Sequence, residues 1–105
     1  MHARLISFSG ADPERRENAI QTIRGTVIPM LRQYDGFEGY LALYDAQNRR
    51  ARAILLWESE DAAEEAEKTL AERREKLAAS VGLTVESADL YEVPVLELEG
   101  AAVRV

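Results

Sequence analysis

The sequence contains no cysteine, which excludes disulfides, thiolate nucleophiles and zinc–thiolate sites. It contains one histidine, His2 beside the N-terminus, which is too little for a histidine metal site or a histidine-based catalytic triad. No apolar run has the length of a membrane span, and the first residues lack the basic and apolar regions of a signal peptide. We therefore expect a cytoplasmic protein that binds no metal and no cofactor and stays off the membrane.

Positive charge is also scarce. The chain of 105 residues has 13 lysines and arginines against 19 aspartates and glutamates, for a formal net charge of −6. This balance argues against nucleic-acid phosphates and anionic membranes as partners. The length suits one domain with one modest core, which we place at residues 1–94. Residues 95–105 form a C-terminal tail, whose weak alternation favours either a short edge strand or an exchanged strand.

The first third of the chain predicts a strand and an irregular helix. Residues 2–8 form the strand, and a helix should follow because Asp12 is a suitable N-cap and Pro13 is tolerated at the first helical position. Apolar residues then recur at intervals of three and four as far as Tyr34. Pro29 lies inside this pattern, and its ring would clash with the carbonyl group four residues earlier. We therefore expect a kink or a break near it.

The remaining chain predicts three more strands and one more helix. Strands at 37–44 and 51–58 are joined by a polar hairpin loop. The second helix should begin after Ser59, which is a suitable N-cap, and stop at Gly82. Residues 84–93 follow as a fourth strand.

The order strand–helix–strand–strand–helix–strand is typical of the ferredoxin-like arrangement, which is an α+β fold. It predicts a four-stranded antiparallel sheet with two helices on one face. Right-handed crossovers would place the first and third strands side by side, and we expect these two strands to run parallel.

The predicted sheet is apolar on both faces. Leu55, Leu56 and Trp57 are consecutive in the third strand, whereas a strand with one solvated face should alternate. Because the helices cover one face only, we expect a homodimer that buries the other. We assign these residues to the helix side: Phe37, Leu41, Leu43, Ile54, Leu56, Ala88 and Leu90. We assign a second, more aromatic set to the dimer side: Arg4, Ile6, Phe8, Tyr40, Tyr44, Ala53, Leu55, Trp57, Asp89 and Tyr91.

Three short stretches carry a resemblance to a known family. They are PMLRQYDGF at 29–37, LLWESEDA at 55–62 and YEV at 91–93. On these the chain resembles the dimeric α/β-barrel superfamily, in particular the antibiotic-biosynthesis-monooxygenase-like domains, over residues 1 to about 94. The resemblance implies two sheets that close face to face into a dimeric barrel, often around a small-molecule cavity. Relatives include cofactor-free oxygenases of polycyclic aromatic or quinol substrates and haem-degrading enzymes.

The family's functional residues transfer only in part. Trp57 matches the aromatic residue that ends the third strand and lines the cavity in active relatives. The second-helix histidine that binds haem iron in the haem-degrading members is missing, and the neighbourhood of Glu67 is acidic instead. The asparagine of their first strand is also absent. We therefore do not expect haem degradation, and Trp57 is either a cavity wall or an anchor of the dimer interface.

The candidate site combines these residues with the polar groups of the same predicted face. We expect Asp89 to be a catalytic base and Tyr40 to assist proton transfer. Four residues would bind the substrate: Arg4, Tyr44, Trp57 and Tyr91. Arg4 and Asp89 should meet across adjacent strands, either as anion clamp and base or as a structural ion pair.

Three functions fit this interpretation. The first is a small-molecule-binding barrel that acts as a cofactor-independent monooxygenase on an aromatic or quinol substrate. The second is a non-catalytic ligand-binding or stress-response barrel. The third is a purely structural dimer with a filled core.

Overall fold

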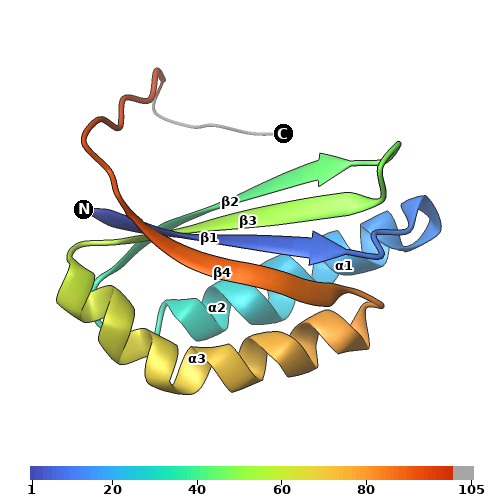
Figure 1. Ribbon diagram of the computed structural model, residues 1–105, viewed down its shortest axis with the longest axis horizontal. Helices are drawn as coiled ribbons and strands as arrows, with labels where there is room; N and C mark the ends of the chain where they lie inside the picture. The colour runs from blue at the N-terminus through green and yellow to red at the C-terminus, as the bar shows by residue number, and fades with distance from the viewer. Residues whose placement is uncertain (101–105) are drawn as a thin grey trace.

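The computed structural model describes residues 1–100 of the chain. Its elements follow the predicted order (Figure 1). They are β1 (His2–Ser9), a 3-10 turn η1 (Pro13–Arg15), α1 (Arg16–Thr22), a π-helical segment η2 (Ile23–Val27), α2 (Ile28–Leu31), β2 (Phe37–Asp45), β3 (Arg50–Trp57), α3 (Glu60–Ser80) and β4 (Thr84–Glu92). The predicted α+β, ferredoxin-like fold with one four-stranded antiparallel sheet is confirmed. None of the described helices is long and apolar enough to cross a membrane.

The sheet has the strand order β2-β3-β1-β4. Every neighbouring pair is antiparallel, so the expectation that the first and third strands run parallel is wrong. The physical reason is that a crossover joins two strands of the same direction, here β1 and β2. The strand between them, β3, follows β2 through a hairpin and must run the opposite way.

Local chemistry starts and stops the helices as predicted. The Asp12 side chain accepts a hydrogen bond from the Glu14 amide at 3.0 Å, and the Ser59 hydroxyl accepts one from the Ala62 amide at 3.1 Å. Gly82 ends α3 with a φ of 79°, a left-handed conformation that glycine adopts without strain.

The expected break near Pro29 is confirmed as a π-helical segment. The Ile28 amide donates to the Ile23 carbonyl, five residues back, so one extra residue is accommodated in the turn just before the proline. Because proline has no N–H to donate, the wider turn is a natural place to change the hydrogen-bonding register. The helix then continues as α2 and packs Leu31 fully into the core.

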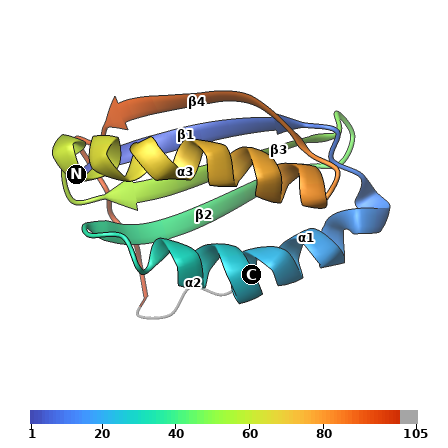
Figure 2. The same ribbon diagram turned by 90° about the horizontal axis from the view of Figure 1, so that it is seen from below.

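The helices cover one face of the sheet (Figure 2), and for most of the strand residues it is the face opposite to the one we predicted. Phe37, Ala88 and Leu90 do lie on the helix side, as predicted. Trp57 is 1% exposed and belongs to a buried cluster between sheet and helices. That cluster consists of Ile6, Leu31, Ala53, Leu55, Trp57, Ala63, Ala66 and Leu70. We call this side the inner face. The period of two along a strand fixes which residues share a face, but both faces are apolar, so the pattern alone does not say which one meets the helices.

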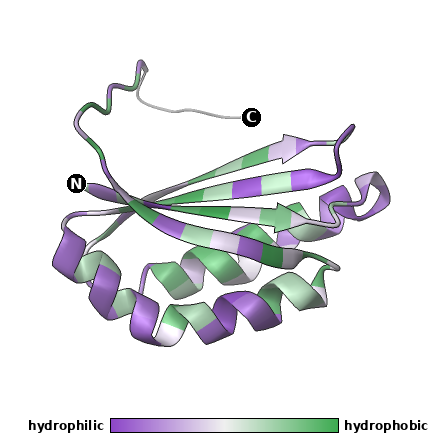
Figure 3. Cartoon of the chain, viewed as in Figure 1, coloured by the Kyte–Doolittle hydropathy of each residue, from purple (hydrophilic) through white to green (hydrophobic). Residues whose placement is uncertain are grey.

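The other side of the sheet, which we call the open face, carries Leu41, Leu43 and Tyr91. Their exposed fractions are 50%, 45% and 52%. Figure 3 shows apolar bands along all four strands, although only the inner face is covered by helices. Several hydrophobic side chains therefore remain half in water in a single copy of the chain.

Beyond β4 the described part of the tail forms no strand within the chain. The Val93 amide donates to the Met1 carbonyl at 3.0 Å, and residues 94–100 then leave the sheet. The sequence predicts a short edge strand or an exchanged strand over residues 95–105. Within one copy, residues 95–100 form no such edge strand. The last part of the tail, 101–105, lies outside the described residues.

Replacing Trp57 by alanine should lower the free energy of unfolding by about 3–5 kcal/mol, because a large ring with 1% exposure leaves a cavity in a packed core. Chemical denaturation with fluorescence or circular dichroism measures it. The matched control is Tyr44→Ala, whose ring is 40% exposed and should cost about 1 kcal/mol. A loss of only that size for Trp57→Ala would contradict the packed interior.

Candidate functional site between the sheet and the third helix

Arg4 is the buried charge from which the site is built. Its residue is 7% exposed, and it lies in β1 between Leu55 of β3 and Leu90 of β4. A guanidinium in such apolar surroundings must find carboxylate partners, because an unpaired buried charge is very costly. Helix α3 covers this part of the inner face and supplies the partners.

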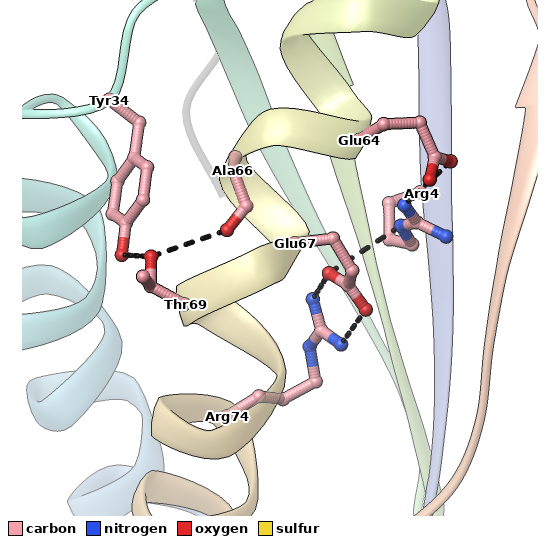
Figure 4. Close-up of polar contacts among 7 residues, drawn as sticks. All are labelled: Arg4, Tyr34, Glu64, Ala66, Glu67, Thr69 and Arg74. Carbon is pink, nitrogen blue, oxygen red and sulfur yellow. Dashed lines mark hydrogen bonds and ion pairs between the residues drawn. The ribbon is translucent and has the colours of Figure 1, made fainter.

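Two glutamates of α3 meet Arg4 (Figure 4). Arg4 Nη2 lies 3.4 Å from Glu64 Oε1, and Arg4 Nε lies 3.7 Å from Glu67 Oε1. Arg74 donates to both Glu67 oxygens, at 2.8 Å from Nη1 and 2.7 Å from Nη2. Spacings of three and seven residues put all three side chains on one side of α3. Glu67 is thus clamped between two guanidinium groups.

The cluster has an excess of positive charge at its buried end. The Arg4 and Arg74 side chains are 8% and 9% exposed and share the half-buried Glu67, while Glu64 is 58% exposed. Burial acts to raise the pKa of Glu67, but the hydrogen bonds and charge of Arg74, with the charge of Arg4, outweigh it and hold that pKa below its ordinary value. Two fixed cations sharing one buried anion favour an additional negative group nearby.

Tyr40 brings a hydroxyl to the same inner face. It lies in β2 opposite Leu55, so Tyr40, Leu55 and Arg4 form one row across the sheet. Burial raises the pKa of Tyr40 to about 12, although the positive charge of Arg74 acts to lower it. At neutral pH the phenol is therefore protonated, and it can donate a hydrogen bond but cannot act as a base.

Aromatic rings pack around Trp57, which is a diagonal neighbour of Arg4 on the inner face. The Trp57 ring meets Tyr34 edge to face at 6.4 Å between centroids and Phe37 at 5.7 Å. The Tyr34 hydroxyl lies 2.8 Å from Thr69 Oγ1, a contact that joins the turn after α2 to α3 (Figure 4).

A glycine turn fixes this end of α2. Gly36 adopts a φ of 83°, and a Cβ there would lie 2.7 Å from the Ala62 Cβ, which is closer than side-chain contacts allow. Its carbonyl accepts from the Glu58 amide at 2.8 Å. The turn before β2 is thereby held against the start of α3, which positions Tyr34 over the site.

The structure separates the six predicted site residues. Arg4, Tyr40 and Trp57 share the inner face, and Arg4 and Trp57 are diagonal neighbours on adjacent strands. Asp89 pairs in register with Leu5, and Tyr91 with Ala3. Asp89 and Tyr91 are therefore on the open face, one residue out of phase with Arg4.

The predicted contact between Arg4 and Asp89 is consequently wrong, and so is a single cavity lined by all six residues. A one-residue shift in register reverses the face of every side chain, and the sequence did not fix the register of β4 against β1. Tyr44 is on the inner face but near the other end of β2, where Arg16 lies over its ring at 5.8 Å from the centroid. It does not join the cluster.

Sequence reasoning missed Glu67, Arg74 and Tyr34. The glutamate and arginine belong to the second predicted helix, from which the sequence predicts no site residue. They flank the stripe of Ala63, Ala66 and Leu70, and that position beside the buried stripe was the available signal. Tyr34 was recognised only as part of an apolar stripe.

The fold and the inner-face site define the class of protein. The chain has the fold of the antibiotic-biosynthesis-monooxygenase-like proteins of the dimeric α/β-barrel superfamily, so the predicted resemblance is confirmed at the level of the fold. No protein-family model matches the sequence. No curated protein is significantly similar to it.

Three solved structures represent this likeness. A monooxygenase from the gene ActVA-Orf6 of Streptomyces coelicolor, in complex with nanaomycin D, is 21% identical with a TM-score of 0.70, over 94% of this chain and 92% of that chain. An antibiotic biosynthesis monooxygenase, described as putative, from Deinococcus radiodurans is 18% identical with a TM-score of 0.68, over 95% and 100%. SnoaB, a cofactor-independent oxygenase from Streptomyces nogalater, is 15% identical with a TM-score of 0.64, over 90% and 94%.

The low pKa of Glu67 predicts a loss of stability in acid. A carboxylate whose pKa is lower in the folded state binds fewer protons there than in the unfolded chain. Its contribution to the free energy of unfolding is therefore present above the unfolded pKa of about 4.3, and it is lost as the pH falls through the folded-state pKa. The free energy of unfolding measured between pH 7 and pH 3 should therefore fall less steeply in Glu67→Gln than in the wild type. Glu75→Gln, on the exposed side of α3, is the control and should keep the wild-type slope. Equal slopes for all three proteins would contradict the clamp.

Proposed function

We propose that this protein is a small-molecule-binding dimeric α/β-barrel protein that acts as a cofactor-independent monooxygenase on an aromatic, phenol- or quinol-type substrate. The observation that carries the proposal is the pair of buried guanidinium groups, Arg4 and Arg74, around the half-buried carboxylate of Glu67, with Trp57 as a diagonal neighbour of Arg4. Two of the similar structures are a monooxygenase and a cofactor-independent oxygenase, which supports the same reaction class.

The chemistry needs a substrate that reacts with dioxygen once it is deprotonated. Positive charge from Arg4 and Arg74 would lower the pKa of a bound phenol and stabilise its phenolate. Tyr40, protonated at neutral pH, would donate a hydrogen bond to a substrate oxygen. Glu64 lies 3.4 Å from Arg4 and is largely exposed, so it is the carboxylate in place of Asp89 that would take the phenolic proton and pass it to water.

The reaction balances without an external reductant. A phenol with a free para C–H position plus O₂ gives a quinone plus water. One oxygen atom becomes the new carbonyl oxygen, and the other leaves as water with the phenolic hydrogen and the para hydrogen. The four electrons that reduce dioxygen come from the ring as it is oxidised to the quinone. The residues of the site supply binding, charge and proton transfer.

Access to the Trp57 ring requires a small movement. The ring is covered, and the contact between Tyr34 and Thr69 closes the space above it. A flat substrate would enter when Tyr34 separates from Thr69 and would then stack against Trp57. A hydroxyl pair is a weak enough link for that, since the net contribution of such a hydrogen bond is about 1 kcal/mol.

The same burial favours a second candidate. Trp57 and Leu31 are each 1% exposed, so the interior is well packed as it stands. A purely structural dimer needs nothing more, and a non-catalytic ligand-binding barrel needs only the opening movement. Ligand binding and oxygen consumption separate these functions from the oxygenase.

The homodimer is part of the proposal, on the opposite face from the one predicted from sequence. The Trp57 face is already covered by the helices, whereas Leu41, Leu43 and Tyr91 of the open face are about half exposed. An apolar sheet face of this kind is usually covered by another layer. We propose that a second copy packs its own open face against it.

Wild-type protein should shift its thermal unfolding upward with members of a panel of phenols, naphthols and quinols, and should consume oxygen with at least one of them. Tyr40→Phe should reduce that turnover about 10²-fold while retaining the fold, because one donor to the developing charge is lost. Tyr44→Phe, at the other end of β2, is the control and should keep wild-type turnover. A thermal shift without oxygen uptake would support the non-catalytic binding barrel instead. The absence of both responses would support the structural dimer.

Leu43→Asp should convert the dimer to a folded monomer of 11.7 kDa, because it puts a charge into the apolar surface of the proposed interface. Sedimentation at micromolar concentration measures the mass. Ala71→Asp, an apolar-to-acidic change on the exposed side of α3, should leave the dimer intact. Wild-type protein that sediments as a monomer would overturn the dimer.

A further inference from the structure

The segment after β4, residues 95–99, contains apolar and acidic residues and is largely exposed in a single copy of the chain. It leaves the sheet on the side away from the helices (Figure 1). Val95, Leu96 and Leu98 are 78%, 48% and 69% exposed, and the leucines alternate with Glu97 and Glu99. A run that alternates leucine with glutamate has the pattern of a strand with one apolar and one charged side.

The open face offers a complementary surface at the hairpin end of β3. Arg52 lies in register between Ser7 and Leu43, and Arg50 lies between Ser9 and Asp45, so both guanidinium groups belong to the open face. Within residues 1–100 neither forms an ion pair with a carboxylate.

Two shallow hollows flank these arginines. One, of about 360 Å³, lies on the β1 side, and the other, of about 300 Å³, lies on the β2 side beside Leu43. The carboxylate that lines the first hollow, Glu86, already accepts a hydrogen bond from the Ser9 hydroxyl. Asp45 lines the second hollow and accepts hydrogen bonds from Asn48. The hollows therefore combine apolar side chains and two exposed arginines with two carboxylates that already have hydrogen-bond donors.

We infer that residues 95–99 of one copy dock at the rim of the open face of a second copy, with the leucines beside Leu43 and with Glu97 and Glu99 beside Arg50 and Arg52. This inference rests on the proposed sheet-to-sheet dimer and names the segment that completes it. Charge complementarity and the exposed apolar residues on both sides carry it.

Distances within one chain argue for a second copy. Glu92, the last residue of β4, is paired with His2, whereas Arg52 is level with Ser7, five residues further along β1. That is about 17 Å along the strand, plus about 10 Å across two strand spacings. Glu97 is five residues beyond Glu92, and the chain turns out of the sheet on the way. It cannot double back far enough to reach its own Arg52.

A two-fold dimer removes this obstacle. If the axis lies between the two sheets and perpendicular to the strands, the end of β4 in one copy faces the β2–β3 hairpin end of the other. Figure 1 shows that these two ends are at opposite sides of one copy. The tail of each copy then starts beside the arginines of its partner, and the contact is made twice.

The absence of native cysteine allows a direct test on the full-length chain. We expect the double variant Glu97→Cys/Arg52→Cys, oxidised at micromolar concentration, to form a covalent dimer on a non-reducing gel. Glu97→Cys/Arg32→Cys, with its second thiol on the exposed end of α2, is the matched control and should remain mostly uncrosslinked. An intrachain disulfide, seen as a monomer without free thiols, would overturn the inference.

Charge exchange gives an independent readout. Arg50→Glu/Arg52→Glu should weaken dimerisation about tenfold, because two attractive pairs become repulsive in each contact. Adding Glu97→Arg/Glu99→Arg to the same chain should restore wild-type affinity. A wild-type dimer that responds to neither change and forms no interchain crosslink would reject the tail contact but keep the proposed dimer. A monomeric wild type would reject both.

Discussion

The sheet of this protein is apolar on both faces, while its helices all lie on one of them. On the covered side the large rings and the leucines pack into a closed core around Trp57. On the other side leucines and a tyrosine remain half exposed. Burial of apolar area is the main favourable term in folding and in association, so the covered face stabilises the single chain and the open face favours assembly. One face of the sheet therefore packs against the helices, and the other is available to pack against a second copy.

The core is interrupted at one point by a charge, and the candidate site follows from it. Arg4 lies between leucines of two neighbouring strands, where its guanidinium has no access to bulk water. Pairing it recruits Glu67 from α3, and Glu67 in turn holds Arg74. A buried ion cluster is a weak source of stability compared with an apolar replacement. Its position on the inner face, level with Tyr40 and diagonal to Trp57, is the basis for the proposed binding of electron-rich, acidic aromatic molecules.

The two faces connect function to assembly through β1 and β3. Alternate residues of these strands contribute Arg4 and Trp57 to the inner face, and Leu5 and Arg52 to the open face. A second copy or its tail against the open face would hold these central strands in place, and with them the residues of the site. Assembly and ligand binding would then depend on the same pairing of β1 with β3, because this pairing fixes which face of the sheet each side chain occupies.

The sequence by itself determined the elements, their order and the fold, because caps, prolines, glycines and periodicity act locally, as at Asp12, Pro29, Ser59 and Gly82. It also grouped the strand residues correctly in β3 and, apart from Phe37 beside the register shift, in β2. It did not determine which group meets the helices, since both are apolar, nor the pairing of Asp89, since register arises between strands. The partners of Arg4 were equally out of reach. Glu67 and Arg74 lie more than sixty residues away along the chain, and only the packing of α3 on the sheet brings them together.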